Sequence, residues 1–384
     1  MTQPRKRIPV TIVTGFLGAG KSTLLNRILK DPAMKDAAVI INEFGDVGID
    51  HLLVETSGDS IIELSDGCLC CTVRGELIDT LASLMDGMQT GRVRPLQRIV
   101  IETTGLADPA PVMQSVMGNP IIAANFELDG VVTVVDAVNG LQTLDNHLEA
   151  LKQVAVADRL VISKALLAEE VALVKLRERL RMLNPRARLI DADMPEAGSV
   201  AMLVNGLYDP ATKVADVARW LGEENDHDHD HHHDEHDHED DHHRDSHGHD
   251  HHHHDVNRHG EDIRSFSIVH DRPIDPAALE MFIDLLRSAH GERLLRMKAI
   301  VCVAGDPDRP VVLHGVQNVF HPPARLAAWP DPADRRTRMV LITRDLPEAF
   351  VTDLFDAFTG TPRIDRPDRA ALEDNPLAIP GFKA

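Results

Sequence analysis

Gly15-Phe16-Leu17-Gly18-Ala19-Gly20-Lys21-Ser22 lies between an apolar run at residues 8–13 and a helix-like segment at residues 23–30. The pattern G-x-x-x-x-G-K-S between a strand and a helix is typical of the phosphate-binding loop, or P-loop, of nucleotide-binding proteins. Glycines let successive backbone N–H groups point at phosphate oxygens, and the following helix N-terminus adds partial positive charge. The residues predicted to contact the nucleotide here are Gly15, Gly18, Ala19, Gly20, Lys21, Ser22 and Thr23.

Lys21, Ser22 and Glu102 are the residues predicted to act on the phosphates. In P-loop proteins the lysine reaches the β- and γ-phosphates, and the hydroxyl holds Mg²⁺. Glu102 directly follows an apolar run at residues 98–101, where a carboxylate can hold Mg²⁺ or orient the attacking water. Gly105 can present its N–H to the γ-phosphate. We predict that Lys21 and Glu102 are catalytic; the alternative is that Glu102 faces solvent at a strand end.

Short apolar runs alternate with helical patterns through the first part of the chain. Strands are predicted at residues 8–13, 37–41, 60–64, 98–101, 130–135 and 159–162, and helices at residues 22–29, 77–88 and 169–183. This alternation predicts an α/β fold, a P-loop NTPase domain with a mostly parallel sheet and helices on both faces. Ligands of such sheets bind beyond the C-terminal ends of the strands.

The strand at residues 159–162 runs into Ser163-Lys164-Ala165-Leu166. Nucleotide sites that select guanine usually carry N-K-x-D here, with the aspartate accepting two hydrogen bonds from the base. Lys164 is therefore predicted to lie along the base, although it can also be a solvated lysine. Leu166 replaces the aspartate, which leaves the preference for guanine open.

Three of the four cysteines lie in Cys68-Leu69-Cys70-Cys71, after a predicted turn at residues 66–67. Thiolates prefer Zn²⁺, Cu(I) and related soft ions, and a tetrahedral site needs one or two further ligands. Glu43, Asp46 and Asp50 are candidate oxygen donors, and Glu43 is the one we favour. A buried thiol cluster or a redox pair is the alternative. The fourth, Cys302, lies in an apolar run and is predicted to be a core residue.

The acidic charge of the chain is concentrated in one tract. The formal net charge of the 384 residues is −21, and residues 223–262 carry 16 Asp and Glu against two Arg, a net of −14. Of 22 histidines, 16 lie between His227 and His259. The tract is predicted to be a disordered, metal-capturing linker, because imidazole and carboxylate groups bind divalent cations. The alternative is a solvated, self-repelling linker.

Composition and patterning also set aside several classes of protein. No basic stripe suits a nucleic-acid backbone, and no apolar run approaches the length of about 18 residues that a membrane span requires. The N-terminus leads into the P-loop without the apolar region of a signal peptide. We therefore expect a cytoplasmic protein that binds neither nucleic acid nor membrane.

Residues 263–384 are predicted to form a smaller C-terminal α/β domain, after a P-loop domain at residues 1–222 and the linker at 223–262. Strands are predicted at residues 265–269, 299–303, 311–315 and 338–342, and helices at residues 276–289 and 347–358. His314 and His321 could be metal ligands, but isolated histidines near strand ends are more often structural or solvated. This domain is the predicted surface for recognising a partner.

Taken together, these motifs resemble the CobW family of metal-linked P-loop GTPases. The resemblance rests on the P-loop, on Asn42-Glu43-Phe44-Gly45, on Gly67-Cys68-Leu69-Cys70-Cys71 and on Glu102-Thr103-Thr104-Gly105-Leu106-Ala107-Asp108-Pro109. It extends to Arg296-Met297-Lys298-Ala299 and Gly315-Val316-Gln317, and covers nearly the whole chain apart from the histidine-rich insert.

This resemblance implies a GTPase whose cycle is linked to a metal. It implies a metallochaperone or insertase that delivers zinc or cobalt to a client metalloprotein or a metal-cofactor biosynthesis enzyme. Cys68, Cys70 and Cys71 would then supply the metal site, and Lys21, Ser22 and Glu102 would serve GTP and Mg²⁺. The alternative function is a nucleotide-binding metal buffer or sensor without active transfer, and the oligomeric state stays open.

Overall fold

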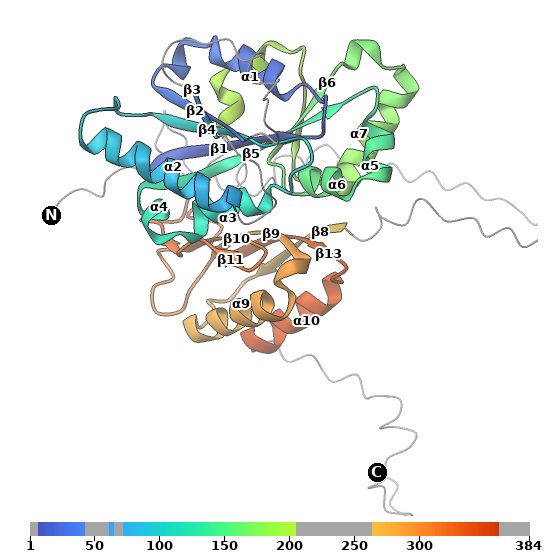
Figure 1. Ribbon diagram of the computed structural model, residues 1–384. Coiled ribbons are helices and arrows are strands. Elements are labelled where there is room, and N and C mark those ends of the chain that lie inside the picture. Colours follow the sequence, from blue (N-terminus) through green and yellow to red (C-terminus); the bar gives the residue numbers. More distant parts are fainter. Residues whose placement is uncertain (1–6, 43–60, 65–71, 205–262, 361–384) are drawn as a thin grey trace, which may run out of the picture.

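The computed structural model describes residues 7–42, 61–64, 72–204 and 263–360. Within these residues, seven parallel strands form one sheet in the order β3-β2-β4-β1-β5-β6-β7 (Figure 1). The strands are β1 (Ile8–Gly15), β2 (Ala37–Asn42), β3 (Ile61–Leu64), β4 (Arg98–Glu102), β5 (Phe126–Asp136), β6 (Arg159–Ser163) and β7 (Arg188–Asp191). All five residues of β4 are buried, as expected for a central strand covered on both faces.

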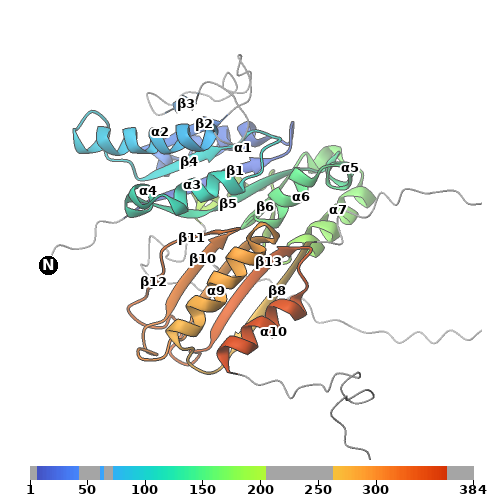
Figure 2. The same cartoon turned by 60° about the horizontal axis from the view of Figure 1, so that its bottom comes forward.

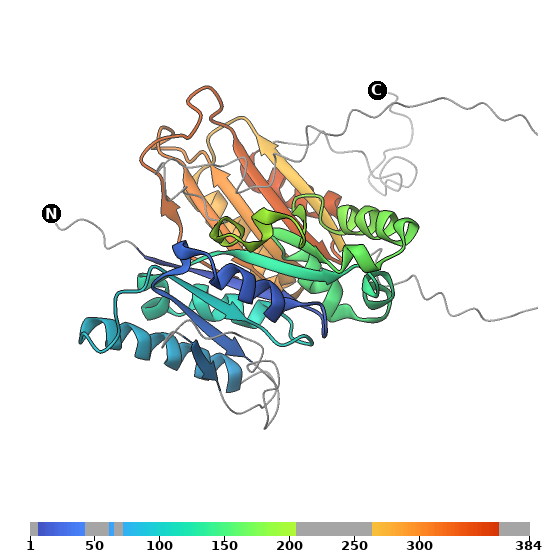
Figure 3. The same ribbon diagram turned by 90° about the horizontal axis from the view of Figure 1, so that it is seen from above.

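Helices cover both faces of this sheet. One face carries α1 (Lys21–Leu29) and 3₁₀ turns at Pro195–Gly198 and Val200–Leu203, which lie nearest the viewer in Figure 3. The helices of the other face are α2 (Thr72–Gln89), α3 (Ala110–Gly118), α4 (Pro120–Asn125), α5 (Gly140–Asn146), α6 (Leu148–Ala155) and α7 (Glu170–Leu183). The predicted α/β class with a mostly parallel sheet is confirmed.

A second, antiparallel sheet follows in the C-terminal part, in the order β11-β10-β9-β13-β8 with β12 paired to β10. Helices α9 and α10 cover its outer face (Figure 2). The elements are β8 (Ile263–His270), α9 (Pro276–His290), β9 (Leu294–Val301), β10 (Val311–Val316), β11 (Val319–Phe320), β12 (Ala324–Arg325), β13 (Thr337–Arg344) and α10 (Glu348–Thr359). The side chain of Asp275 caps α9 by accepting from Ala277 N and Ala278 N.

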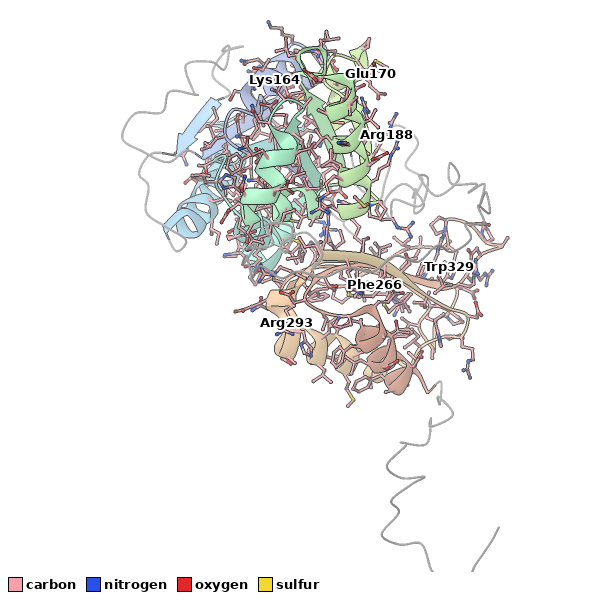
Figure 4. The ribbon with its side chains drawn as sticks, turned by 90° about the vertical axis from the view of Figure 1, so that its right-hand side faces the viewer. Lys164, Glu170, Arg188, Phe266, Arg293 and Trp329 are labelled. Atoms are coloured by element: carbon pink, nitrogen blue, oxygen red, sulfur yellow. The ribbon has the colours of Figure 1, made fainter. Side chains whose placement is uncertain are left out.

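The inner face of the second sheet packs on the helices of the first domain. Ile263, Leu295, Val316 and Ile342 belong to the same apolar core as residues of α3, α6 and α7. The molecule is therefore layered as helix, sheet, helix, sheet and helix, with one core shared between the two domains (Figure 1). In Figure 4, Lys164 lies in the upper part of the first domain, away from Phe266 and Arg293 of the second.

Several predicted boundaries were wrong. The strand predicted at residues 130–135 begins at Phe126, and the helix predicted at residues 77–88 begins at Thr72. The strand predicted at residues 299–303 spans Leu294–Val301. Its first part was missed because Arg296 and Lys298 interrupt the apolar run, and both are buried against a carboxylate of the first domain. Strand β7 and helices α3 to α6 were not predicted.

Among the described helices, none is long and apolar enough to cross a membrane.

Candidate functional site

The P-loop connects β1 to α1. Gly20 occupies the position before the helix with a φ of +96°, in the left-handed region that glycine adopts without steric cost. The buried Lys21 side chain, 6% exposed, folds back over the loop. Its Nζ donates to Gly15 O at 3.0 Å and to Phe16 O at 3.3 Å. A cation is thus held against the loop that the sequence assigns to phosphate.

Ser22 and Glu102 meet beside this lysine. Ser22 Oγ donates to Glu102 Oε1 at 3.0 Å, and the two residues are 8% and 3% exposed. They come together because β1 and β4 are parallel neighbours, so their C-terminal ends lie at the same edge of the sheet. A hydroxyl and a carboxylate are oxygen ligands of the kind that Mg²⁺ prefers, so this pair fits a magnesium ion.

Gly105 lies directly against the P-loop. A Cβ added to Gly105 would stand 2.6 Å from Leu17 N, so a larger residue here would displace the loop. The strand end before Gly105 is also tied to β1, since Thr103 N donates to Val13 O at 3.0 Å and Thr103 Oγ1 to Thr14 Oγ1 at 2.7 Å. The backbone that follows Glu102 is therefore anchored to the phosphate-binding loop.

Lys164 reaches the P-loop from the end of β6. Its Nζ donates to Gly18 O at 2.9 Å and to Asp136 Oδ2 at 2.7 Å, while its backbone takes a left-handed φ of +56°. Burial would raise the pKa of Asp136, but Lys164 and hydrogen bonds from Val138 N and Asn139 lower it below its ordinary value. Asp136 was not among the residues predicted from the sequence, and its position at the end of β5 was the available signal.

Leu166, at the place where guanine-selective sites carry an aspartate, is 86% exposed in a 3₁₀ turn at Ala165–Leu167. Its neighbour Leu167 is exposed as well. The two apolar side chains leave no carboxylate at this position. The side chain at position 166 is therefore apolar and exposed.

A cavity of about 220 Å³ lies behind the P-loop, between β5 and helices α5 and α6. Phe16 and Leu17 line one side of it, and Ala150, Gln153 and Val154 of α6 line another. The ring of Phe16 lies 4.4 Å, centroid to centroid, from the ring of His147, the residue before α6. Helix α6 thus begins in contact with the P-loop.

The predicted metal ligands Glu43, Cys68, Cys70 and Cys71 lie outside the described residues, as does the tract at residues 223–262. In the described ranges, no group of three or more His, Cys, Asp or Glu side chains could hold a metal ion. Asn42 and Leu64, the last residues of β2 and β3, are paired neighbours in the sheet. The last described residues of β2 and β3 therefore lie at the sheet edge that carries Ser22 and Glu102.

His314, His321 and Cys302 have structural partners. Arg296 Nε lies 3.3 Å from His314 Nε2, and burial holds the pKa of His314 well below its usual value. Arg7 lies 2.9 Å from His321 Nε2, and Cys302 is buried in the second domain. His314 therefore lies beside Arg296 within the second domain, His321 contacts Arg7 of the first domain, and Cys302 is a core residue as predicted.

A P-loop with a buried lysine, on a parallel sheet flanked by helices, defines the first domain as a P-loop nucleotide-binding domain of the α/β class. Residues 9–191 match the family model described as CobW/HypB/UreG, nucleotide-binding domain, and residues 263–359 match the cobalamin synthesis protein cobW C-terminal domain. The chain belongs to the CobW family, which confirms the resemblance seen in its motifs.

Relatives of known name cover nearly the whole chain. The zinc chaperone YjiA of Escherichia coli (strain K12) is 31% identical over 356 residues, 91% of this chain and 98% of the relative. The zinc chaperone CobW of Sinorhizobium sp is 31% identical over 381 residues, 90% of this chain and 95% of the relative. The crystal structure of Zn(II)-bound YjiA GTPase from E. coli has a TM-score of 0.59 at 27% identity, covering 92% of this chain and 99% of that one.

Proposed function

We propose that this protein is a GTP-hydrolysing metallochaperone that binds zinc and delivers it to a client metalloprotein or a metal-cofactor biosynthesis enzyme. The observation that carries the proposal is the gathering of Lys21, Ser22 and Glu102 at one sheet edge. From the same edge the chain leaves β2 and β3 and continues into Glu43 and the Cys68-Leu69-Cys70-Cys71 motif. Relatives named as zinc chaperones and a neighbour named as a GTPase support this assignment.

Each residue of the nucleotide site has a proposed role. Lys21 contacts the β- and γ-phosphates of GTP, and Gly105 directs its N–H at the γ-phosphate. Ser22 and Glu102 hold Mg²⁺, which neutralises charge on the phosphates when it is bound. Lys164 lies along the base above the P-loop, since its Nζ already contacts Gly18 O.

Zinc is the proposed cargo, with cobalt as the alternative. Cys68, Cys70 and Cys71 are proposed to supply thiolates, and Glu43 an oxygen, to the zinc ion. The histidine-rich tract at residues 223–262 captures metal weakly and at many sites. The test is whether the zinc-loaded protein releases zinc to a chelator when it hydrolyses GTP but not with a non-hydrolysable analogue. Equal release in both would instead favour a metal buffer.

Leu166→Asp is expected to strengthen the preference for GTP over ATP by about tenfold, because a carboxylate that accepts hydrogen bonds from guanine contributes about 1–3 kcal/mol. The exposed turn at residues 165–167 can take a carboxylate without disturbing the core. The measurement is the ratio of kcat/KM for GTP to that for ATP. Leu167→Asp is the matched control, since it adds the same charge one residue away. Equal ratios in both variants would show that this position does not read the base.

A further inference from the structure

Helix α6 contacts three parts of the molecule that are far apart in the sequence: the P-loop, the segment after Glu102, and the second domain. It is short, Leu148–Ala155, and the ring of His147 just before it lies against Phe16 of the P-loop. Its last turn leads to Asp158, the residue before β6. This placement makes α6 a direct physical connection between the nucleotide site and the second domain.

The segment after Glu102 is held by two side chains of α6. Gln153, 1% exposed, donates its Nε2 to Gly105 O at 3.2 Å and to Ala107 O at 3.0 Å. Lys152 Nζ makes an ion pair with Asp108 Oδ2 at 2.7 Å. The segment that lies against the P-loop is therefore fastened to α6 at three of its residues, and any movement of Gly105 acts on the helix.

Arg296 and Lys298 of the second domain contact the chain about one helical turn after Gln153. Arg296 donates to Val156 O and pairs with Asp158 Oδ2 at 2.8 Å, and Lys298 Nζ lies 2.5 Å from Asp158 Oδ1. Arg296 and Lys298 are buried, and the Asp158 side chain is only 9% exposed. Burial would raise the pKa of Asp158, but the facing cations lower it, so the carboxylate is ionised at neutral pH. Val156 follows Gln153 by three residues, close to one turn of helix.

The C-terminal end of α6 is also fixed to its own domain, so it can act as a unit. Asn184 Nδ2 donates to Val154 O, Ala155 O and Ala157 O at 2.9, 3.0 and 2.9 Å. Thr133 Oγ1 donates to Gln153 O at 2.7 Å. A helix whose terminal carbonyls are all engaged moves with these partners rather than by fraying.

Space for a small displacement exists on one side of this helix. The cavity of about 220 Å³ behind the P-loop is lined by Ala150, Gln153 and Val154. Protein interiors are otherwise close-packed and resist displacement. A shift of α6 toward or away from the P-loop therefore meets less resistance than a shift into the shared core.

We propose that α6 carries the nucleotide state of the P-loop to the second domain, and that Gln153 is the positioning residue that joins the segment at Gly105 to the helix. The inference rests on the proposed function, since it requires GTP at the P-loop. When the γ-phosphate accepts a hydrogen bond from the Gly105 N–H, the movement of Gly105 displaces Gln153. Helix α6 then transmits the displacement through Val156 and Asp158 to β9. If the bound nucleotide changes the affinity of the second domain for a partner, linkage requires that the partner change the affinity for the nucleotide by the same factor.

The test is hydrogen exchange of β9 (Leu294–Val301) in the full chain, with GDP and with a non-hydrolysable GTP analogue. Exchange rates in β9 are expected to differ by about fivefold or more between the two nucleotides. Gln153→Leu removes the two hydrogen bonds to Gly105 and Ala107, and it is expected to abolish this difference. The same variant should lower kcat for GTP by about tenfold while KM changes by less than about threefold. Gln142→Leu on the exposed side of α5 is the matched control and keeps both properties.

A second pair of variants tests the same connection in case Gln153→Leu does not fold. Lys152→Met breaks the partly exposed ion pair with Asp108 and should reduce the nucleotide-dependent difference, and Lys152→Arg should restore it. Identical β9 exchange with both nucleotides bound to the unaltered protein overturns the inference and leaves the proposed GTPase function standing. Failure of both nucleotides to bind, measured by direct titration, overturns both.

Discussion

Lys21→Met is expected to slow GTP hydrolysis by about 10² to 10³-fold, the usual effect of removing a charge that stabilises a transition state. The Lys21 ammonium is buried against Gly15 O and Phe16 O, where the low-dielectric surroundings strengthen its interaction with phosphate. Methionine keeps an unbranched apolar side chain and removes the charge. Steady-state turnover of GTP, with nucleotide affinity measured separately, gives the result.

Lys30→Met is the control for this change. Lys30 directly follows the last residue of the same helix, α1, and is exposed, so the same chemical change there tests the loss of a lysine outside the loop. Thermal unfolding of both variants shows whether the fold is kept. Turnover within threefold of the unaltered protein in Lys21→Met would contradict the assignment of the P-loop lysine.

Replacing Cys68, Cys70 and Cys71 together by serine is expected to weaken zinc binding by about 10³-fold or more. Thiolates in such sites account for most of a zinc binding free energy of about 10–16 kcal/mol, and serine does not supply an equivalent soft ligand. The variant is made in a chain that lacks residues 223–262, so that the histidine-rich tract does not mask the loss. Competition with a zinc chelator of known affinity measures the change.

Cys302→Ser is the matched control, because Cys302 lies buried in the second domain and belongs to its core. Its substitution is expected to lower stability slightly and leave zinc affinity unchanged. Unaltered zinc affinity in the triple variant would contradict the cysteine site. Loss of affinity already on deleting residues 223–262 would assign metal binding to the tract and favour a metal buffer.

The P-loop, the parallel sheet and the meeting of Ser22 with Glu102 could be predicted from the sequence. Apolar runs of near-constant length between helical patterns specify a parallel sheet, and parallel strands bring their C-terminal ends to one edge. Residues that follow neighbouring strands must then be close, although they are 80 positions apart in this case. Local patterns were sufficient because the topology of such folds is restricted.

Gln153 and the contacts of β9 could not be predicted in the same way. Gln153 is one polar residue in a short helix, and the carbonyls it binds are 46 and 48 positions away. Arg296 and Lys298 place charges inside a strand, and a buried charge is normally excluded unless it is paired. Their partner Asp158 is 138 and 140 positions away, so no local pattern reveals that the charges are compensated.

Delivery of zinc that depends on GTP hydrolysis is the central claim, and a release assay tests it most directly. The full chain is loaded with zinc and mixed with a fluorescent zinc chelator in GTP, GDP or a non-hydrolysable GTP analogue. Release in GTP is expected to exceed release in either other nucleotide by about tenfold, a difference of about 1.4 kcal/mol in barrier. In Lys21→Met the three rates should be equal. Equal rates of release in all three nucleotides for the unaltered protein would contradict the claim.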